Sequence, residues 1–246
     1  MRRANPIENT GIIRRKSDKA FLGSCFIFRY PEVLLTAAHC VGEYDLTEIE
    51  ITLTGIMVRN PFQITRVDLA QNADLAIVRI SGINEINITW PVYQICDDRL
   101  YGEDFAIFGY PQEYFEGQPA PTPRLFKGYF QIFFRYKSHL GYCYSAVELN
   151  ISCPGGLSGS AVFNQNFHGL LYGVVTENVK TTTELESVIE IDDDGKQFKE
   201  SFHNMVNYGV AVWLSDVSGW IDAHVHPVSP EEIARRSNNQ HAWGDM

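Results

Sequence analysis

Residues 153–162 read CPGGLSGSAV, a stretch that combines three glycines and two serines immediately before an apolar run. Glycine tolerates backbone conformations that a side chain would forbid. Gly155, Gly156 and Gly159 therefore permit a tight turn that presents one serine together with neighbouring backbone N–H groups. Because Gly, Pro and Ser are also ordinary turn residues, a simple hairpin loop explains the stretch equally well. The rest of the chain has to distinguish these two interpretations.

The bulk composition limits the classes of protein to which the chain can belong. It has 246 residues, 45% of them hydrophobic, which is enough for one large β domain or two small units with a substantial core. Lys and Arg number 20 against 30 Asp and Glu, a net charge of −10. This charge disfavours nucleic acid or an anionic membrane as a partner. We find neither an apolar run long enough to span a bilayer nor a secretory signal peptide.

The five cysteines, at positions 25, 40, 96, 143 and 153, are odd in number and widely spaced. A disulfide scaffold is not expected from such a pattern, and reduced thiols in a cytoplasmic protein are the better interpretation. No cofactor or metal is expected either. The nearest candidate ligand set is Asp222, His224 and His226, and it is better interpreted as the end of a surface helix.

Short runs rich in Val, Ile, Phe and Tyr recur along the chain, separated by Gly, Pro, Asn and Asp. About a dozen such runs at this spacing are typical of β-barrels or of a β-sandwich. A helical pattern is confined to a short segment that begins near Ser215. Beyond Pro227 the chain becomes polar, which predicts a loosely docked tail.

Residues 177–200 stand out by their charge. They contain eight acidic and three basic residues, so their net charge of −5 is half that of the whole chain. The simplest interpretation of such a segment is a solvated loop.

Three polar residues stand in apolar surroundings: His39 in VLLTAAHCV, Asp74 in NADLAIVRI, and Ser158 in the opening stretch. Each has a simple explanation by itself, as a core histidine, a turn aspartate and a loop serine. Together they supply what acyl transfer by a hydroxyl requires. These requirements are a nucleophile, an imidazole base, a carboxylate that orients the imidazole, and backbone N–H groups that face the developing oxyanion.

With these motifs in this order, the sequence resembles the trypsin- and chymotrypsin-like serine proteases, through LLTAAHC, ADLAIVRI and GGLSGSAV over about residues 20–225. Its entry strand GSCFIF looks more like the bacterial members. The resemblance implies an all-β fold of two six-stranded Greek-key barrels with a short C-terminal helix. The N-terminal barrel would span residues 10–95 and the C-terminal barrel 96–225. A polar tail would follow at 226–246, and the whole would form one peptidase domain.

The same resemblance implies a role for each site residue. Ser158 would be the nucleophile, His39 the general base and then acid, and Asp74 the residue that orients His39. The backbone N–H groups of Gly156 and Ser158 would form the oxyanion hole. Ser158 is preferred to Ser160 because only Ser158 has a glycine two positions before it.

The Asp-Leu-Ala string occurs twice, so Asp68 is an alternative to Asp74. Asp74 is preferred because an alternating apolar strand follows it. Thr176 matches the position whose hydroxyl supports the aspartate in many members of the family.

Family register places the substrate pocket at Ser152, Thr176, Glu177 and Gly209. Ser152 is neutral where trypsin has an acidic floor, so a neutral substrate side chain is the simplest expectation. Glu177 and the acidic segment that follows it support a second hypothesis, which is attraction of a basic substrate residue.

Two features depart from the family pattern. Leu157 stands where animal digestive members have an aspartate that pairs with a newly cut N-terminus, so activation by N-terminal trimming is not expected. Cys25 is offset by about two residues from the cysteine that bridges the histidine loop in the family. Whether Cys25 and Cys40 form a disulfide therefore remains open.

These observations predict a serine endopeptidase, a hydrolase that works through an acyl-enzyme on Ser158. We expect its substrates to be proteins or peptides, its setting to be intracellular, and its activity to be controlled by a partner or trigger. The alternative is a catalytically silent binding module that uses the protease fold to recognise a peptide or protein.

Overall fold

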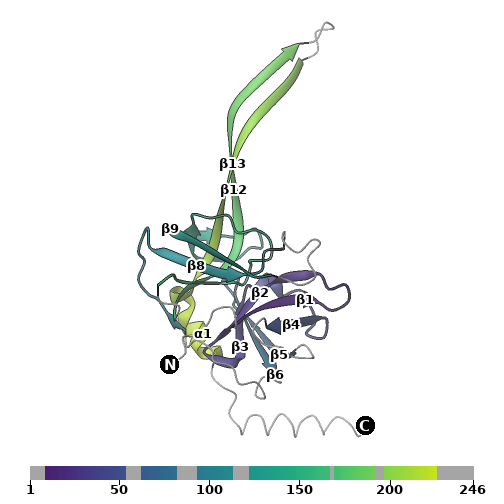
Figure 1. Cartoon of the computed structure of the whole chain (residues 1–246), viewed down its shortest axis with the longest axis vertical. Coiled ribbons are helices and arrows are strands. Elements are labelled where there is room, and N and C mark those ends of the chain that lie inside the picture. The colour runs from purple at the N-terminus through teal and green to yellow at the C-terminus, as the bar shows by residue number, and fades with distance from the viewer. Residues whose placement is uncertain are drawn as a thin grey trace.

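The computed structural model describes residues 9–53, 62–81, 93–112, 122–166, 169–191 and 197–225. Nearly all regular structure in these ranges is β, arranged as two barrel-like sheets packed against each other (Figure 1). The only α-helix among these residues is short and close to the C-terminal end. The all-β, two-barrel fold predicted from the sequence is thereby confirmed.

The first sheet has six strands in the order β4-β1-β2-β3-β6-β5, and a bridge between Ile51 and Phe62 brings its two ends together. The strands are β1 Thr10–Arg15, β2 Phe21–Phe28, β3 Tyr30–Thr36, β4 Ile49–Leu53, β5 Gln63–Leu69 and β6 Ala76–Ser81.

Strand β6 shows how the alternating sequence joins the two barrels. Ala76 and Val78 point into the core of the first barrel, while Ile77 packs into a second cluster that includes Val174 and Val212 of the other barrel. Successive side chains of a strand face opposite sides, so a strand that is apolar throughout is buried on both faces. Strand β6 therefore lies between the two cores.

The second sheet has the order β11-β8-β9-β10-β13-β12-β7, and an additional β11–β12 pairing closes six of its strands into a ring. The strands are β7 Gln94–Ile95, β8 Asp104–Gly109, β9 Arg124–Lys137, β10 Cys143–Leu149, β11 Ala161–Asn164, β12 Leu170–Ile191 and β13 Gln197–Trp213. The seventh strand, β7, pairs with β12 in parallel.

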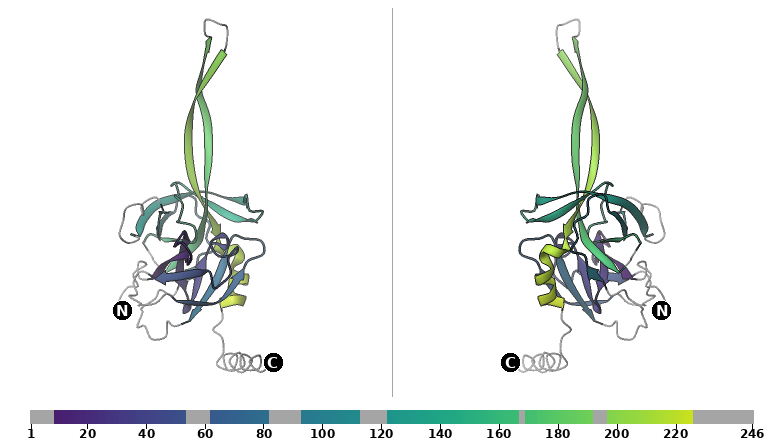
Figure 2. Two further views of the ribbon diagram at one scale, coloured as in Figure 1. Left: turned by 90° about the vertical axis from the view of Figure 1, so that its right-hand side faces the viewer. Right: turned by 90° about the vertical axis from the view of Figure 1, so that its left-hand side faces the viewer.

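Strands β12 and β13 continue far beyond this barrel as a two-stranded arm (Figures 1 and 2). Their antiparallel register runs from Gly173 paired with Trp213 to Ile191 paired with Gln197. The prediction of a solvated loop over residues 177–200 is therefore wrong for 177–191 and 197–200, which form strands. β-Branched residues such as Thr181 and Thr182 favour the extended backbone, and pairing with β13, the next strand along the chain, outweighs the high charge.

The chain leaves β13 through a short 3-10 turn, η4 Leu214–Val217, and then forms helix α1 Ser218–Val225. Ile221 and Val225 of the helix are buried in the cluster between the barrels. No helix in the described ranges is long and apolar enough to cross a membrane. The tail predicted at 226–246 lies outside the described residues.

Candidate active site

His39 lies just after β3, in the 3-10 turn η2 Ala38–Cys40. Its neighbours Ala38 and Cys40 are buried and anchor the turn in the first barrel. The His39 side chain between them is 27% exposed. The turn thus directs the imidazole out of the first core and toward the second barrel.

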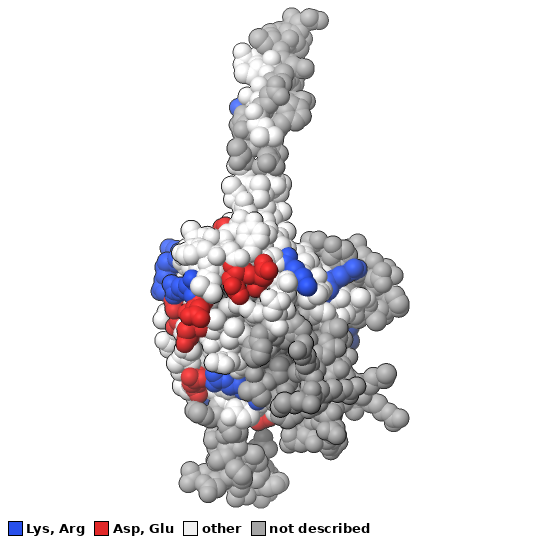
Figure 3. Space-filling model, turned by 60° about the vertical axis from the view of Figure 1, so that its left-hand side comes forward, with Lys and Arg blue, Asp and Glu red and all other residues white. Residues whose placement is uncertain are grey.

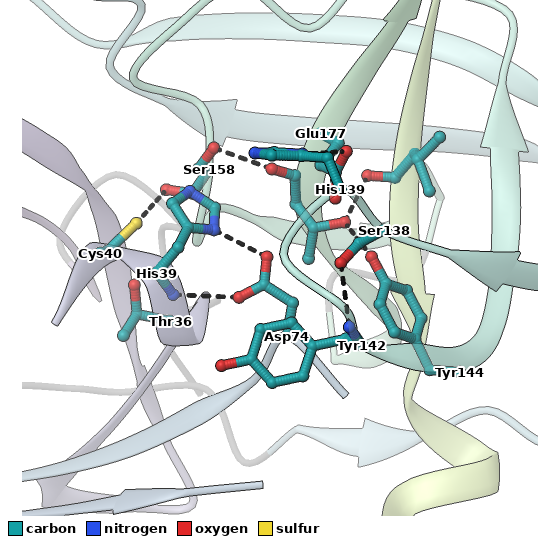
Figure 4. Close-up of polar contacts among 12 residues, drawn as sticks. Thr36, His39, Cys40, Asp74, Ser138, His139, Tyr142, Tyr144, Ser158 and Glu177 are labelled. Carbon is teal, nitrogen blue, oxygen red and sulfur yellow. Dashed lines mark hydrogen bonds and ion pairs between the residues drawn. The ribbon is translucent and has the colours of Figure 1, made fainter. Parts of the chain in front are cut away.

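Asp74 lies in the turn between β5 and β6 and is fully buried. Its Oδ2 atom is 2.7 Å from Nδ1 of His39, and its Oδ1 atom accepts a hydrogen bond of 3.0 Å from the His39 backbone N–H (Figure 4). Because the carboxylate is an acceptor, Nδ1 carries the proton, and Nε2 of the neutral ring presents a lone pair. The two bonds fix both the orientation and the tautomer of the ring.

The environment of His39 changes its basicity. Burial is the largest single influence and disfavours the imidazolium form. The hydrogen bond to Asp74 and the contact with Cys40 together outweigh it, so the pKa of His39 is raised. A raised pKa means that the ring takes up a proton readily and holds it.

The alternative aspartate has a different partner. Asp68 accepts a hydrogen bond of 2.8 Å from Nε of Arg66, whereas Asp74 is the carboxylate that contacts His39. The contact expected between Thr176 and Asp74 is not formed. The Thr176 hydroxyl donates to the carbonyl of Val210 at 3.2 Å and lies 3.0 Å from the hydroxyl of Tyr144.

The glycines around Ser158 are required by the geometry of the turn. Gly156 and Gly159 have φ angles of +91° and +86°, in the left-handed region that side chains disfavour. A Cβ atom on Gly159 would lie 2.0 Å from the carbonyl oxygen of Ser24, and one on Gly156 would lie 2.4 Å from that of Tyr110. The turn is therefore packed directly against backbone from elsewhere in the fold.

The carbonyl groups of this turn determine where its N–H groups point. The Gly155 carbonyl accepts a hydrogen bond of 2.7 Å from the backbone of Gln112, and the Leu157 carbonyl accepts one of 2.9 Å from Ser160. In a trans peptide, a carbonyl and the following N–H point in opposite directions. The N–H groups of Gly156 and Ser158 are thus directed away from these partners. Within the described residues neither N–H is engaged in a hydrogen bond.

Ser24 holds this turn in place, and sequence reasoning missed it. Its hydroxyl donates to the Gly156 carbonyl at 2.8 Å and accepts from the Tyr110 N–H at 3.2 Å, while its backbone N–H donates to the Ser158 carbonyl at 2.7 Å. Ser24 is fully buried. A serine inside the apolar entry strand GSCFIF was the only signal available, and its partners lie more than 80 residues away in the sequence.

The two candidate serines differ in access. Ser160 is fully buried, whereas Ser158 is partly exposed. The Ser158 hydroxyl donates to the carbonyl of Thr176 at 3.1 Å and points away from the His39 ring (Figure 4). The structure thus brings His39, Asp74 and Ser158 to one place, with the serine hydroxyl bonded to backbone.

A sequence profile of the trypsin-like peptidase domain family matches residues 23–174, more than half of the chain. The chain belongs to this family. The resemblance inferred from the sequence motifs is thereby confirmed, and His39, Asp74 and Ser158 all lie within the matched region of this peptidase domain. No curated protein matches the chain.

Solved protease structures share the fold of this trypsin-like domain. The protease Rv3671c from M. tuberculosis, in its active form, matches with a TM-score of 0.60 and 17% identity, over 92% of this chain and 84% of that one. The HtrA-type protease AlgW with a tripeptide matches with a TM-score of 0.62 and 17% identity, over 91% and 62% of the two chains. The MamO protease domain from Magnetospirillum magneticum matches with a TM-score of 0.59 and 15% identity, over 90% and 98%. At these identities the matches show a shared fold and nothing about function.

Some of the residues expected to line a substrate pocket of the peptidase domain lie together. The side chain of Asn178 reaches the Ser152 hydroxyl at 3.4 Å and accepts from the backbone N–H of Cys153 at 3.2 Å. Gly209 donates its N–H to Ile151, and a Cβ there would lie 2.3 Å from the sulfur of Cys153. This group of residues joins β12 and β13 to the segment before the serine turn.

Glu177 has a different environment. Its carboxylate is only 12% exposed and accepts a hydrogen bond of 2.8 Å from the Tyr136 hydroxyl. The same oxygen lies 3.1 Å from Nδ1 of His139. Burial, followed by this carboxylate, raises the pKa of Tyr136 to about 12. Glu177 therefore faces the Tyr136–His139 side rather than Ser152, and the sequence alone contained no sign of this pairing.

All five cysteines of the chain are free. The Cys40 sulfur packs against Gly23, where an added Cβ would lie 2.3 Å from it. Gly23 stands two residues before Cys25, so the position opposite Cys40 is a glycine. The bridge that the sequence left open is absent between these two described residues.

A cavity of about 670 Å³ lies between residues 69–73, strand β10 and helix α1. Its lining includes Ala73, Tyr144 and Trp220, and it contains neither His39 nor Ser158. No group of three or more His, Cys, Asp or Glu side chains that could hold a metal ion occurs in the part of the chain that the structure describes.

Proposed function

We propose that the chain is a serine endopeptidase that hydrolyses peptide bonds through an acyl-enzyme on Ser158. The observation that carries this proposal is the pairing of His39 with the buried Asp74, next to a serine whose turn also presents two N–H groups that have no partner among the described residues. A nucleophile, a base of defined tautomer and donors for an oxyanion are the components of acyl transfer.

In this mechanism the Ser158 hydroxyl first rotates about its Cα–Cβ bond, leaving the Thr176 carbonyl for Nε2 of His39. The imidazole takes the hydroxyl proton while the oxygen attacks the substrate carbonyl, and Asp74 stabilises the imidazolium. The N–H groups of Gly156 and Ser158 bind the oxyanion. His39 then gives the proton to the leaving amine, and water, activated in the same way, hydrolyses the acyl-enzyme.

We further propose an intracellular setting and control by a protein partner or trigger. The free thiols of Cys25 and Cys40 beside the site suit a reducing compartment. The resting contact of Ser158 with Thr176 means that one side-chain rotation separates this arrangement from a catalytic one. A partner that stabilises the rotated serine would therefore switch the enzyme on.

A binding module without turnover is the second candidate, and it is favoured by the same resting contact. If the serine hydroxyl stays on the Thr176 carbonyl, His39 has no proton to accept. The fold would then only recognise a peptide, without cleaving it.

Labelling with a fluorophosphonate probe tests the proposed function, because the probe reacts with activated serines. We expect the wild type and Ser160→Ala to be labelled and Ser158→Ala to remain unlabelled. Tryptic mapping of the labelled peptide identifies the modified residue. Absence of labelling in a folded wild-type protein, with and without cell extract as a source of partner, would reject the peptidase in favour of the binding module.

A further inference from the structure

Among the described residues, the arm formed by β12 and β13 has no hydrophobic core of its own. Beyond the pair formed by Lys180 and Asn207, the described strands consist of one two-stranded ribbon that projects away from the barrels (Figure 2). Several large apolar side chains on it are exposed: Leu185 at 68%, Ile189 at 58%, Met205 at 55% and Val206 at 37%. An isolated two-stranded ribbon is only marginally stable in water, and a partner that covers its exposed apolar side chains would stabilise it.

Both outer edges of the arm are also available for pairing. Strand β12 pairs with β11 only as far as Val174, and β13 pairs with β10 only from Gly209 onward. Among the described residues, each strand of the outer arm pairs only with the other. An unpaired edge presents a row of backbone N–H and C=O groups to which an extended polypeptide can add as a strand.

The β12 edge begins at the candidate active site. The Thr176 carbonyl, which accepts the Ser158 hydroxyl, belongs to β12, and the strand continues without interruption to Ile191. The residues from 177 to 191 cover roughly 50 Å of extended chain. A polypeptide bound at Ser158 and extended along this edge would therefore reach the apolar part of the arm.

Charge indicates what kind of polypeptide fits. Residues 181–206 contain seven acidic and two basic residues, a net charge of −5. Two arms of this charge repel each other, which disfavours a second copy of the chain as the occupant. The exposed apolar side chains of Leu185 and Ile189 lie on the same arm, which rises above the barrels in Figure 3, so an occupant must match apolar as well as acidic residues.

We propose that the arm is a docking site for a basic, extended segment of the protein substrate. This segment adds as a strand to the free edge of β12 and covers exposed side chains such as Leu185 and Ile189, while the scissile bond lies at Ser158. The proposal rests on the proposed function and adds to it a substrate class, proteins that carry a basic segment with apolar residues. Short peptides that fill only the site near Ser158 do not need the arm.

The test uses the full chain with Ser158→Ala, so that binding is measured without turnover. The probes are two fluorescent peptides of about 20 residues, long enough for the β12 edge. One repeats Lys-Val-Lys-Thr and the other repeats Glu-Val-Glu-Thr. We expect the basic peptide to bind, the acidic peptide not to bind, and the basic affinity to fall with added salt.

Two arm variants of the Ser158→Ala protein locate the binding. In the first, an Asn-Gly turn replaces residues 181–206 between the cross-strand partners Lys180 and Asn207. In the second, Leu185→Ser and Ile189→Ser keep the arm at full length. We expect about tenfold weaker binding for both, since 1.4 kcal/mol corresponds to tenfold. The matched control is Leu125→Ser with Ile132→Ser, which changes exposed apolar residues of β9 outside the arm and should bind normally.

The shortened-arm variant is also prepared with Ser158 retained. Its labelling by the fluorophosphonate probe reports separately on the candidate active site. Normal labelling together with lost peptide binding supports the proposal. Binding that is unchanged in both arm variants, or equal for both peptides, overturns it even if Ser158 is labelled. Arm-dependent dimerisation in sedimentation experiments also overturns it, because a second copy would then be the occupant. If the protein with Ser158 retained is not labelled, the proposed peptidase activity is rejected. The peptide-binding result then tests the docking site by itself.

Discussion

At the scale of single residues, the contact between His39 and Asp74 determines the chemistry proposed for Ser158. Asp74 is fully buried and both of its oxygens accept hydrogen bonds from His39, one from the ring and one from the backbone. The carboxylate therefore selects one tautomer and stabilises the protonated ring. A proton leaves this imidazole less readily than it leaves a histidine in water, which has a consequence for the pH dependence of the reaction.

We expect the rate of fluorophosphonate labelling to rise with pH through an apparent pKa above 6.5, the value of an unperturbed histidine. Only the neutral imidazole accepts the serine proton, and a raised pKa means that this form is gained only as the pH increases. Asp74→Asn should slow labelling by about 10⁴-fold and lower the apparent pKa. Labelling rates measured from acidic to alkaline pH give both quantities. A wild-type inflection below 6.5 would contradict the assignment.

Ser24 gives a second prediction at this scale, as a positioning residue for the serine turn. Ser24→Ala removes the hydroxyl that lies between the Gly156 carbonyl and the Tyr110 N–H. Two hydrogen bonds to buried backbone groups are then lost, so the free energy of unfolding should fall by about 1–3 kcal/mol. Labelling of Ser158 should also slow, because Gly156 supplies an oxyanion donor in the proposed mechanism.

The matched control for Ser24→Ala is Ser160→Ala. Ser160 is equally buried, but its hydroxyl has no hydrogen-bond partner among the described residues. Its removal should leave both denaturant unfolding and labelling nearly unchanged. If Ser24→Ala lowered stability without slowing the labelling of Ser158, its role would be purely structural.

At the scale of elements, the serine turn between β10 and β11 is shaped by contacts across the two barrels. Its left-handed glycines allow the turn to approach β2 of the first barrel closely enough for Ser24 to bond to it. The turn of the second barrel is thus held by a strand of the first. The position of Ser158 relative to His39 depends on this junction rather than on either barrel alone.

Gly159→Ala tests this dependence. The left-handed backbone alone costs a non-glycine residue about 1–2 kcal/mol. The added Cβ would also lie 2.0 Å from the Ser24 carbonyl and 2.3 Å from the Thr36 hydroxyl, so the loss of stability should exceed that figure. Gly155→Ala is the control, since its Cβ would meet only Gln112, at 3.6 Å. Urea unfolding compares the two, and equal stabilities would contradict the described packing.

At the scale of the whole molecule, four of the five cysteines are buried in the cores of the two barrels. Cys25 and Cys40 lie in the core of the first barrel and Cys96 and Cys153 in that of the second, while Cys143 is exposed. Burial raises the pKa of the thiol of Cys25, and that of Cys153 to about 12. Buried thiols with raised pKa values react slowly, because the thiolate is the nucleophile.

We therefore expect iodoacetamide to modify one thiol of the native protein rapidly, at Cys143, and all five after denaturation. Peptide mass mapping over a time course distinguishes these sites. Thermal unfolding should be the same with and without a reductant, because no disulfide is present among these cysteines. A midpoint that falls on reduction would indicate a bridge and contradict the structure.

The sequence by itself determined the family and showed that three of its motifs resemble catalytic ones. The residues around His39, Asp74 and Ser158 form short local strings, and such strings can be recognised without a structure. Alternating apolar runs also predicted strands, since that pattern depends only on neighbouring residues. Tertiary structure decided the rest. The charge of residues 177–200 predicts a loop, whereas β12 is extended here through backbone pairing with β13, the next strand along the chain, and composition does not reveal that pairing. The roles of Ser24 and of Glu177 with His139 follow from contacts between remote segments, and local sequence carries no information about which distant groups the fold brings together.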